Sequence, residues 1–196
     1  DKWDMLQLWL ARQQISILCL QETRWPFTSE WAQQQYHIVH SGGGKQTAGL
    51  MCMVSKQLCS SDELSWQEPV PGRILHVRVH GAHGSLDIIN VYQHVHTPQR
   101  LDERSEVWQH LSSLLGGLPR RNTVLLLGDM NTSLQRRTDA VGLDTYNMDM
   151  TRSRGPNHTD SNVLMNILTT YALTALNTWT HELGPTYQFS SQGHHS

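Results

Sequence analysis

The chain has 196 residues, of which 38% are hydrophobic and 16% charged, and its formal net charge is −2 at pH 7. This length predicts a single domain over residues 1–196, with a core large enough to fold without a disulfide or a metal. No apolar run approaches the ~18 residues that cross a membrane, and the first residues lack the pattern of a signal peptide. The composition excludes membrane, collagen-like and disordered chains, and we expect an intracellular protein of the nucleus or cytoplasm that is not secreted.

The charge, the cysteines and the histidines favour no particular ligand. A net charge near zero gives no general attraction for nucleic acid, although it leaves room for a local basic stripe. Three cysteines without metal-ligand spacing are typical of reduced core thiols. Among twelve histidines, His94 and His96 are two apart and His194 and His195 adjacent, but no nearby Cys or carboxylate cluster completes a zinc site. We expect solvated or structural histidines.

The first half of the chain predicts a helix followed by strands. Apolar residues at helical spacing predict a helix over the first dozen residues, and the apolar run 15–20 is typical of a buried strand that stops at polar residues. Further strands are predicted over 36–40 and 49–54, with a turn at the glycines 42–44 between them. A helix leading into a buried strand indicates an α/β architecture.

The middle of the chain predicts an antiparallel hairpin, a helix and another strand. Residues 73–80 and 85–92 are strand-like and are joined by a glycine-containing turn, which argues against a purely parallel sheet. Thr97 and Pro98 are typical of a helix start, and Gly116 and Gly117 of its end. Residues 123–127 are the strongest prediction of a buried strand in the chain, and this strand leads into Asp129.

The last third has a weaker pattern. Residues 135–158 predict a long surface loop, Asp160 is expected to cap a final helix, and residues 186–189 are strand-like. Neither a repeat nor a linker is evident, so the chain is interpreted as a single domain.

Two of the predicted strands end at acidic residues, Glu22 and Asp129. In open α/β sheets, ligands bind beyond the carboxyl ends of the strands. Two carboxylates there, with Asn131 two residues after the second, provide oxygen ligands of the kind that hold a hard divalent cation. Asp and Asn are also common in turns, so the spacing alone leaves both interpretations open.

Three motifs together carry a family resemblance. Residues Ile17–Thr23 (ILCLQET), Asn90–Tyr92 (NVY) and Leu127–Asn131 (LGDMN) occur in the order of the endonuclease/exonuclease/phosphatase family, and the chain resembles that family over nearly its whole length. The resemblance implies an α/β fold (α+β in some schemes), a two-sheet β-sandwich flanked by helices as in DNase I.

The resemblance also implies roles for individual residues. Glu22 would be a ligand of Mg²⁺, for which Mn²⁺ could substitute, and Asp129 would orient or deprotonate the attacking water. Asn131 would hold that water or a phosphate oxygen, and Tyr92 would donate a hydrogen bond to the scissile phosphate. Phosphodiester hydrolysis needs an activated water and relief of charge on the phosphoryl oxygens, which a metal and fixed donors supply.

Alternative interpretations remain for several of these residues. Tyr92 is also explained as an aromatic residue at the core edge, and Asn131 as a turn residue. Arg24, Gln188 and His195 are candidate substrate-binding residues, although a solvated arginine explains Arg24 equally well.

The chain departs from the family pattern at both ends. Relatives begin with a strand that ends in asparagine and end with strands that carry an Ile-Asp and then a Ser-Asp-His motif. The sequence therefore resembles an incomplete domain that lacks its first and last strands, and we expect the 196-residue chain alone to be inactive.

Within the family, Gln93 and the segment 118–122 (LPRRN) are most similar to endonuclease domains of non-LTR retrotransposons. This resemblance implies a DNA-nicking endonuclease, monomeric, with DNA as substrate and a reverse transcriptase domain in the same parent chain. The alternatives are a phosphoesterase that acts on inositol phosphates or other small phosphoesters, and an inactive truncated domain.

Overall fold

The computed structural model describes residues 2–44, 48–132, 134, 140–142 and 159–179. The chain divides into two compact units, Asp1–Asn131 and Thr132–Ser196, and each is described here by itself. Within the described residues, the helices are too short or too polar to span a membrane.

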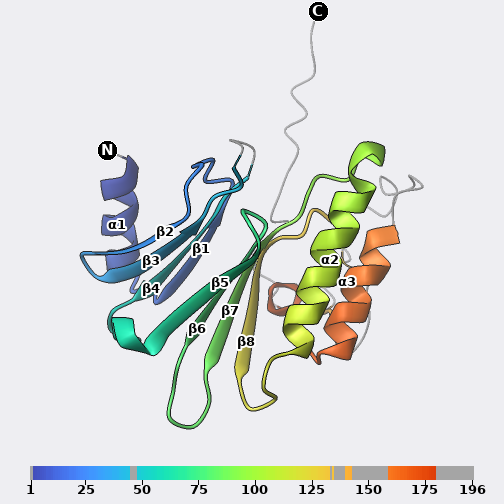
Figure 1. Cartoon of the computed structure of the whole chain (residues 1–196). Coiled ribbons are helices and arrows are strands. Elements are labelled where there is room, and N and C mark those ends of the chain that lie inside the picture. The colour runs from blue at the N-terminus through green and yellow to red at the C-terminus, as the bar shows by residue number, and fades with distance from the viewer. Residues whose placement is uncertain (1, 45–47, 133, 135–139, 143–158, 180–196) are drawn as a thin grey trace, which may run out of the picture. The chain divides into compact units, whose positions relative to one another are not determined.

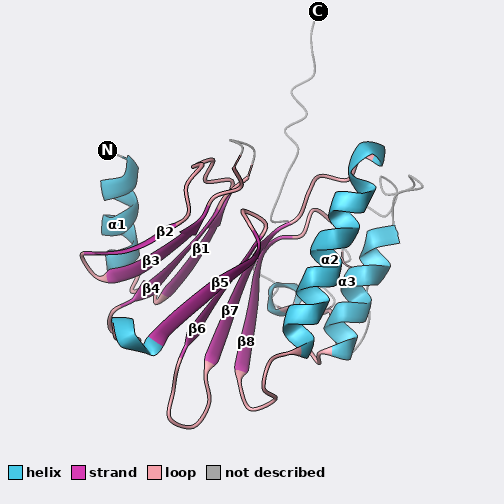
Figure 2. Ribbon diagram, in the orientation of Figure 1, coloured by secondary structure: helices cyan, strands magenta, loops and turns pink. Residues whose placement is uncertain are grey.

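The first unit contains two four-stranded sheets with helices beside them, as Figures 1 and 2 show. The strand orders are β1-β4-β3-β2 and β5-β6-β7-β8, and every pairing is antiparallel except that of β7 with β8. The predicted two-sheet sandwich and the predicted hairpin are confirmed. The elements are α1 (Lys2–Arg12), β1 (Ile17–Gln21), β2 (Ser29–Gln33), β3 (Tyr36–Ser41), β4 (Leu50–Ser55), β5 (Leu64–Val70), β6 (Ile74–Val79), β7 (Leu86–Tyr92), α2 (Leu101–Gly116) and β8 (Thr123–Asp129), with short 3₁₀ turns at Ser61–Glu63 and Pro98–Arg100.

The hydrophobic core lies between the two sheets. It combines side chains of β3 and β4 with side chains of β6 and β7, among them Val39, Cys52, Leu75, Val77 and Ile88. The alternation of apolar residues along β6 explains this arrangement, because successive side chains of a strand point to opposite faces. Helix α1 and β1–β4 form a second cluster on the other face of the first sheet, with Leu10, Tyr36, Ile38, Met51 and Met53 at its centre.

The connection from β7 through α2 to β8 explains why these two strands are parallel. A parallel pair needs a crossover connection, and α2 supplies it. The helix buries Val107, Trp108, Leu111 and Leu115, whose spacing places them on one face of a helix. Consequently β7 and β8 end at the same edge of the sheet, with Tyr92 opposite Asp129.

The structure corrects the expected burial of two strands. The runs 15–20 and 123–127 predict buried strands, but β1 is half-buried along its length and the end of β8 is exposed. The reason is that each is an edge strand of its sheet among the described residues. Strands β2 and β5 are not predicted from the sequence, because they occupy the opposite edges and have few consecutive apolar residues.

The predicted helix starts differ slightly from the observed ones. Thr97 precedes the 3₁₀ turn Pro98–Arg100 rather than α2, and its side chain makes no capping hydrogen bond. In the second unit, Asp160 lies within the first turn of α3 (Thr159–Thr170) rather than before it. This helix buries Leu164, Met165, Ile167 and Leu168. The predicted loop 135–158, apart from 140–142, and the predicted strand 186–189 lie outside the described residues.

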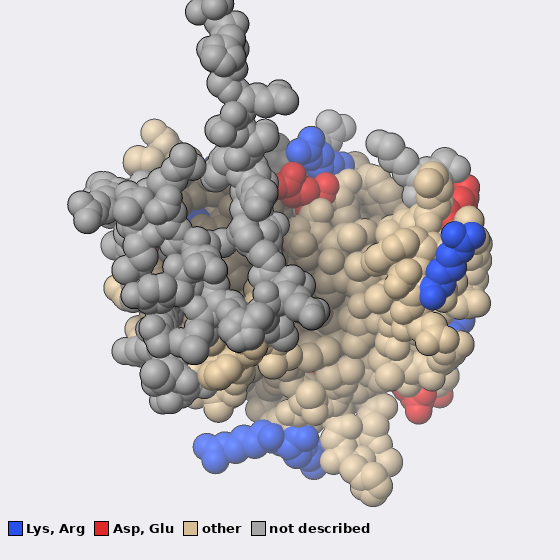
Figure 3. Space-filling model, turned by 180° about the vertical axis from the view of Figure 1, so that it is seen from behind, with Lys and Arg blue, Asp and Glu red and all other residues tan. Residues whose placement is uncertain are grey.

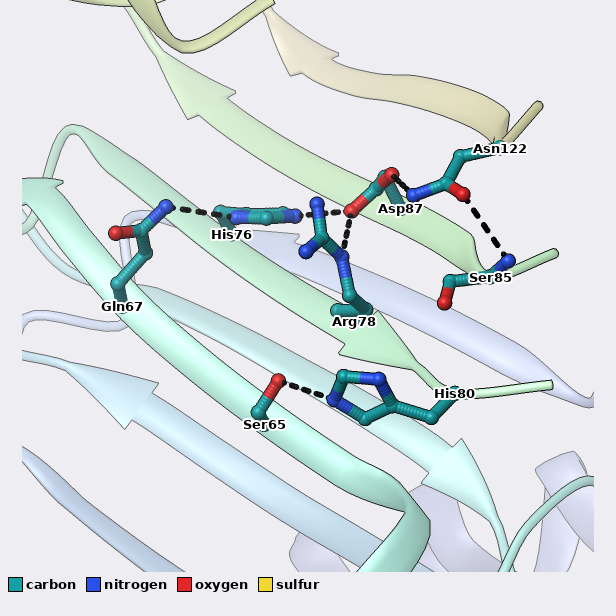
Figure 4. A network of polar contacts seen from close by, with 8 residues as sticks. All are labelled: Ser65, Gln67, His76, Arg78, His80, Ser85, Asp87 and Asn122. Atoms are coloured by element: carbon teal, nitrogen blue, oxygen red, sulfur yellow. Dashed lines mark hydrogen bonds and ion pairs between the residues drawn. The ribbon is translucent and has the colours of Figure 1, made fainter. Parts of the chain in front are cut away.

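A polar network lies on the face of the second sheet that points away from the core (Figure 4). Asp87 is fully buried at its centre and accepts hydrogen bonds from Arg78 Nε (2.7 Å) and Asn122 Nδ2 (2.7 Å). His76 donates from Nε2 to the same carboxylate at 2.6 Å, because Gln67 Nε2 donates to its Nδ1 at 3.0 Å. This neutral tautomer satisfies both ring nitrogens.

Asp87 and two buried histidines, His76 of this network and His40 of the first sheet, make the stability depend on pH. Burial lowers the pKa of His76 and of His40, so the unfolded chain binds more protons than the folded chain below the ordinary histidine pKa of ~6.5. Burial alone would raise the pKa of Asp87, but hydrogen bonds from Arg78, Asn122 and His76 outweigh it and lower the pKa. Its contribution is present above the unfolded carboxyl pKa and is lost as pH falls through the lower folded one.

We therefore predict that the Tm of the chain falls between pH 7 and pH 5 and falls further below pH 4. Thermal unfolding followed by circular dichroism measures it. In His76→Gln the decrease between pH 7 and pH 5 should become smaller, whereas His83→Gln, at an exposed turn position, should retain it. A Tm that stays constant or rises on acidification would contradict the prediction.

Candidate active site

The ends of β1, β7 and β8 carry the polar residues that the motifs single out. Glu22 directly follows β1, while Tyr92 and Asp129 end β7 and β8. The first sheet is tied to the second near this point, because Gln21 Nε2 donates to Asn90 Oδ1 at 2.7 Å. The structure thus brings together side chains that lie 70 residues apart in the sequence.

Glu22 and Tyr92 are in direct contact. The Tyr92 hydroxyl donates to Glu22 Oε1 at 2.7 Å, and Arg24 Nη2 donates to Glu22 Oε2 at 3.1 Å. The hydrogen bond from Tyr92 is the largest cause that lowers the pKa of Glu22, followed by the hydrogen bond from Arg24. Glu22 is therefore an ionised carboxylate at neutral pH, in a half-exposed position.

A buried arginine packs against the ring of Tyr92. The Arg73 guanidinium lies 4.6 Å from the centre of the Tyr92 ring, and its Nη1 donates to the Tyr92 carbonyl at 3.3 Å. Burial raises the pKa of Tyr92, and the hydrogen bond to Glu22 and the charges of Glu22 and Asp129 raise it further. The phenol thus stays protonated and able to donate. Arg73 is not predicted from the sequence, because it lies at the start of a strand with no motif around it.

Asn90 fixes the distance between the two sheets at the site. It is fully buried, and its Nδ2 donates to the carbonyls of Leu20 and Met51 at 3.0 Å each. Both carbonyls belong to the first sheet, whereas Asn90 belongs to β7. The sequence motif contains Asn90, but a single sequence does not show that its amide bridges two sheets.

The segment after β8 is fixed by its own hydrogen bonds. Asn131 N donates to Asp129 Oδ1 at 2.9 Å, and Asn131 Nδ2 donates to the Gln93 carbonyl at 2.7 Å. Gly128, immediately before Asp129, has φ +132, and a side chain there would collide with the Val91 carbonyl. The glycine of the motif is therefore required by the close approach of β7.

Arg104 of α2 joins the two segments that follow β7 and β8. It is almost completely buried, and its guanidinium donates to the His94 carbonyl and, at 3.2 Å, to the Asn131 carbonyl. In return, Gln93 Nε2 donates to the Arg104 carbonyl at 3.1 Å. Arg104 is not predicted from the sequence, because an arginine within a helix is typical of a solvated face.

Three of the candidate residues have strained backbone. Glu22, Arg24 and Asn131 have φ values of +56, +58 and +44, in the left-handed region that favours glycine. Such residues cost free energy and cluster at functional sites, where the surrounding structure holds them. The left-handed backbone turns these three side chains in directions that they would not take if each strand continued in an extended conformation.

The donors at this site fit a divalent cation that is held by few protein groups. Mg²⁺ keeps several waters and is bound by one or two carboxylates. Each Glu22 oxygen accepts one hydrogen bond, which leaves further acceptor capacity on both. Among the described residues, no cluster of three or more His, Cys, Asp or Glu side chains is present, so a zinc-type cage is not formed there.

The remaining predicted residues have different outcomes. His94 does not pair with His96: its Nδ1 lies 3.1 Å from Arg100 Nη1 and 3.3 Å from Glu103 Oε2. Burial, followed by the charge of Arg73, lowers the pKa of His94 to about 4. Gln188 and His195 lie outside the described residues. On the face drawn in Figure 3, the described Lys and Arg side chains form small separate groups rather than a broad basic patch.

Comparison with known proteins identifies the family. A sequence model of the Endonuclease/Exonuclease/phosphatase family matches residues 4–193. The chain belongs to this family. No curated protein matches it in a sequence search.

Solved structures of three AP endonucleases share the fold. The AP endonuclease from Archaeoglobus fulgidus is 20% identical, with a TM-score of 0.56, and the match covers 83% of this chain and 63% of that structure. AP endonuclease LMAP from Leishmania major is 13% identical, with a TM-score of 0.60, and the match covers 85% of this chain and 60% of that structure. The Xenopus laevis APE2 catalytic domain is 17% identical, with a TM-score of 0.53, and the match covers 82% of this chain and 62% of that structure. The chain thus spans about three fifths of each of these structures, and the predicted DNase I-like fold is confirmed.

The contact between Tyr92 and Glu22 predicts a measurable coupling. In Tyr92→Phe, the pKa of Glu22 should rise toward the ordinary value for glutamate, because the largest cause of its lowering is removed. A carbon-13 NMR titration of the side-chain carboxyl measures this. Tyr36→Phe is the matched control, since the Tyr36 hydroxyl donates to the Ile15 carbonyl instead. An unchanged Glu22 pKa in Tyr92→Phe would show that the hydrogen bond does not form in solution.

The position of Arg104 predicts a large loss of stability. Arg104→Met should lower the free energy of unfolding by about 2–4 kcal/mol, because two carbonyls lose buried charge-assisted hydrogen bonds. Arg104→Lys should recover only part of this loss, since an ammonium lacks the planar fork. Denaturant unfolding provides both values. Arg12→Met, at an exposed position of α1, should change the free energy by less than about 0.5 kcal/mol.

Proposed function

We propose that this chain is the catalytic part of a divalent-metal-dependent phosphodiesterase, a DNA-nicking endonuclease of a retrotransposon polyprotein. The observation that carries the proposal is the ionised Glu22 carboxylate, held by Tyr92 at the strand ends where Asp129 also lies. The family match and the likeness to structures named as AP endonucleases support hydrolysis of a nucleic-acid phosphodiester.

Each residue has a chemical task in this proposal. Glu22 holds Mg²⁺, for which Mn²⁺ can substitute, and such an ion neutralises charge on a phosphoryl oxygen when bound. Asp129 accepts a proton from the attacking water, and the backbone of Asn131 fixes the orientation of its carboxylate. Asn131 offers its side-chain amide to that water or to a phosphate oxygen.

Tyr92 imposes a choice between two acceptors. A phenol has a single proton, so the hydroxyl donates either to Glu22 or to a phosphate oxygen. We infer that the hydroxyl turns from Glu22 to the scissile phosphate when substrate binds. Arg73 supports this donor role, because it packs against the Tyr92 ring and holds the ring in place, whereas the hydroxyl contacts Glu22 at the edge of the core.

The finer parts of the proposal rest on the sequence. Gln93 and the segment 118–122 support retrotransposon origin, with DNA as substrate, a reverse transcriptase domain in the same parent chain and a monomeric endonuclease. Arg24, Gln188 and His195 are proposed to contact the substrate. The family match over 4–193 supports one domain that includes both units, and the reduced cysteines support an intracellular location.

The proposal predicts loss of nicking in two variants of the parent polypeptide. Nicking of supercoiled plasmid should require Mg²⁺ or Mn²⁺ and stop on addition of EDTA. Glu22→Gln and Asp129→Asn should each reduce the rate by at least a hundredfold, because they remove the metal-binding charge and the proton acceptor. Asp62→Asn, at an exposed 3₁₀ turn, is the matched control and should retain full activity.

The other outcomes separate the alternatives. Unchanged nicking in both variants would refute the assigned site. Hydrolysis of soluble inositol phosphates without plasmid cleavage would favour a small-phosphoester substrate. The 196-residue chain alone is expected to show no measurable turnover, since it spans about three fifths of the structures that it resembles, and efficient nicking by it would refute that expectation.

A further inference from the structure

Two aromatic side chains are exposed in the segment that directly follows Glu22. Trp25 is 37% exposed and Phe27 is 48% exposed, and both lie in the connection between β1 and β2. Their rings stack with centres 5.5 Å apart and an angle of 20° between the planes. The mechanism proposed above uses neither of them.

The two rings are supported by other aromatic residues. The Trp25 ring lies 6.2 Å from the ring of Trp3, 6.4 Å from that of Trp31 and 5.3 Å from that of His40, measured between ring centres. Phe27 also contacts His40, with 5.1 Å between the ring centres. Trp25 and Phe27 therefore form the exposed part of an aromatic cluster, which we call the Trp25–Phe27 platform.

The backbone of this segment is fixed at several points. His40 is fully buried, and its ring nitrogens lie 2.6 Å from the Phe27 carbonyl and 2.7 Å from Thr23 Oγ1. Arg24 N donates to the Ala48 carbonyl at 3.0 Å. At the far end, Thr28 Oγ1 donates to Glu68 Oε2 at 3.0 Å. Because the segment is already ordered, a ligand that stacks on it does not have to order the segment when it binds.

The platform also lies close to the site of hydrolysis along the chain. Trp25 is three residues from Glu22, so their Cα atoms are at most about 11 Å apart. One strand of a duplex rises ~3.4 Å per nucleotide, and this distance therefore corresponds to about three nucleotides. Arg24 lies between the two and its side chain is 68% exposed, which places a cation beside the rings where a polynucleotide carries phosphates.

We propose that the Trp25–Phe27 platform stacks on an unpaired nucleobase next to the phosphodiester that is hydrolysed, so that the substrate is single-stranded or locally opened DNA. This inference rests on the proposed nuclease function. A base inside a closed duplex stacks on its neighbours and exposes no face, whereas every unpaired base offers one to an aromatic ring. Stacking on a base adds affinity that does not depend on cations, and the net charge of the chain is −2.

Binding measurements without metal test the platform separately from catalysis. The probe is a fluorescein-labelled eight-nucleotide single strand in EDTA, compared with a strand of the same length whose four central bases are replaced by abasic spacers, and with a closed hairpin duplex. The 196-residue chain should bind the strand with bases more tightly than the other two. Trp25→Ala should weaken binding of that strand by about tenfold and change the other two affinities by less than twofold.

Three further variants keep the test decisive. Phe27→Leu retains an apolar side chain without a ring face and should also weaken binding of the strand with bases. Trp9→Ala removes a 51% exposed tryptophan from α1 and should leave all three affinities unchanged. Thermal unfolding checks that each variant is folded. If Trp25→Ala is unfolded, Trp25→Phe replaces it. Because Trp25→Phe keeps an aromatic ring, it should bind the strand with bases within threefold of the natural chain.

Several results would overturn the proposal. Equal affinity for the strands with and without bases, or an equal loss in Trp9→Ala, would show that the rings do not stack on bases. Self-association of the chain that Trp25→Ala abolishes, without any change in DNA affinity, would assign the platform to a protein contact. Base-dependent binding by a parent polypeptide that does not nick DNA would refute the proposed nuclease function but not the stacking role of the platform. Nicking of opened and closed DNA that Trp25→Ala leaves unchanged would refute the stacking role but not the nuclease function.

Discussion

The candidate site depends on one buried amide that holds the two sheets together. Asn90 of β7 donates to two carbonyls of the first sheet and accepts a hydrogen bond from Gln21, the last residue of β1. Apolar packing between sheets is non-directional, so by itself it tolerates sliding of one sheet over the other. The hydrogen bonds of Asn90 have fixed directions and lengths, and breaking them would leave buried polar groups without partners. Glu22, one residue after Gln21, can therefore meet Tyr92, two residues after Asn90, at hydrogen-bond distance.

Buried arginines supply the second level of positioning. Arg73 packs against the Tyr92 ring, while Arg104 holds the carbonyls of His94 and Asn131. Each is almost fully buried, although a charged group in the interior is costly unless it is paired or hydrogen-bonded. Both donate hydrogen bonds to backbone carbonyls of the segments that carry the site. Their positive charges favour anions nearby, which is consistent with an ionised Glu22 and with a phosphate substrate.

The sequence predicts the fold well where motif and periodicity agree and poorly where structure depends on distant contacts. The hairpin of β6 and β7, the helix α2 and the strand ends at Glu22 and Asp129 follow from local patterns. β2 and β5 were missed because an edge strand needs few apolar residues, and β5 even contains Pro69. Arg104 was missed for the opposite reason, because its local sequence is typical of a solvated helix face. It is buried by the segments that follow β7 and β8, which end at the same edge of the sheet. The positive φ angle of Glu22 has no local signal either, whereas Asn131 belongs to a residue type that adopts the left-handed region more readily than most.

Charge and aromatic exposure together limit how such a site can recognise a polynucleotide. Binding that depends on phosphate contacts gains affinity from each cation that displaces a counterion, and this chain has a net charge of −2 with no broad basic patch on the described surface shown in Figure 3. Contacts that do not depend on charge add to the affinity of such a protein. Stacking on Trp25 and Phe27 is of that kind, because it depends on the face of a base and is tolerant of sequence. A site built in this way distinguishes open from closed DNA by the accessibility of a base, while Glu22, Asp129 and Tyr92 act on the phosphate that every nucleotide carries.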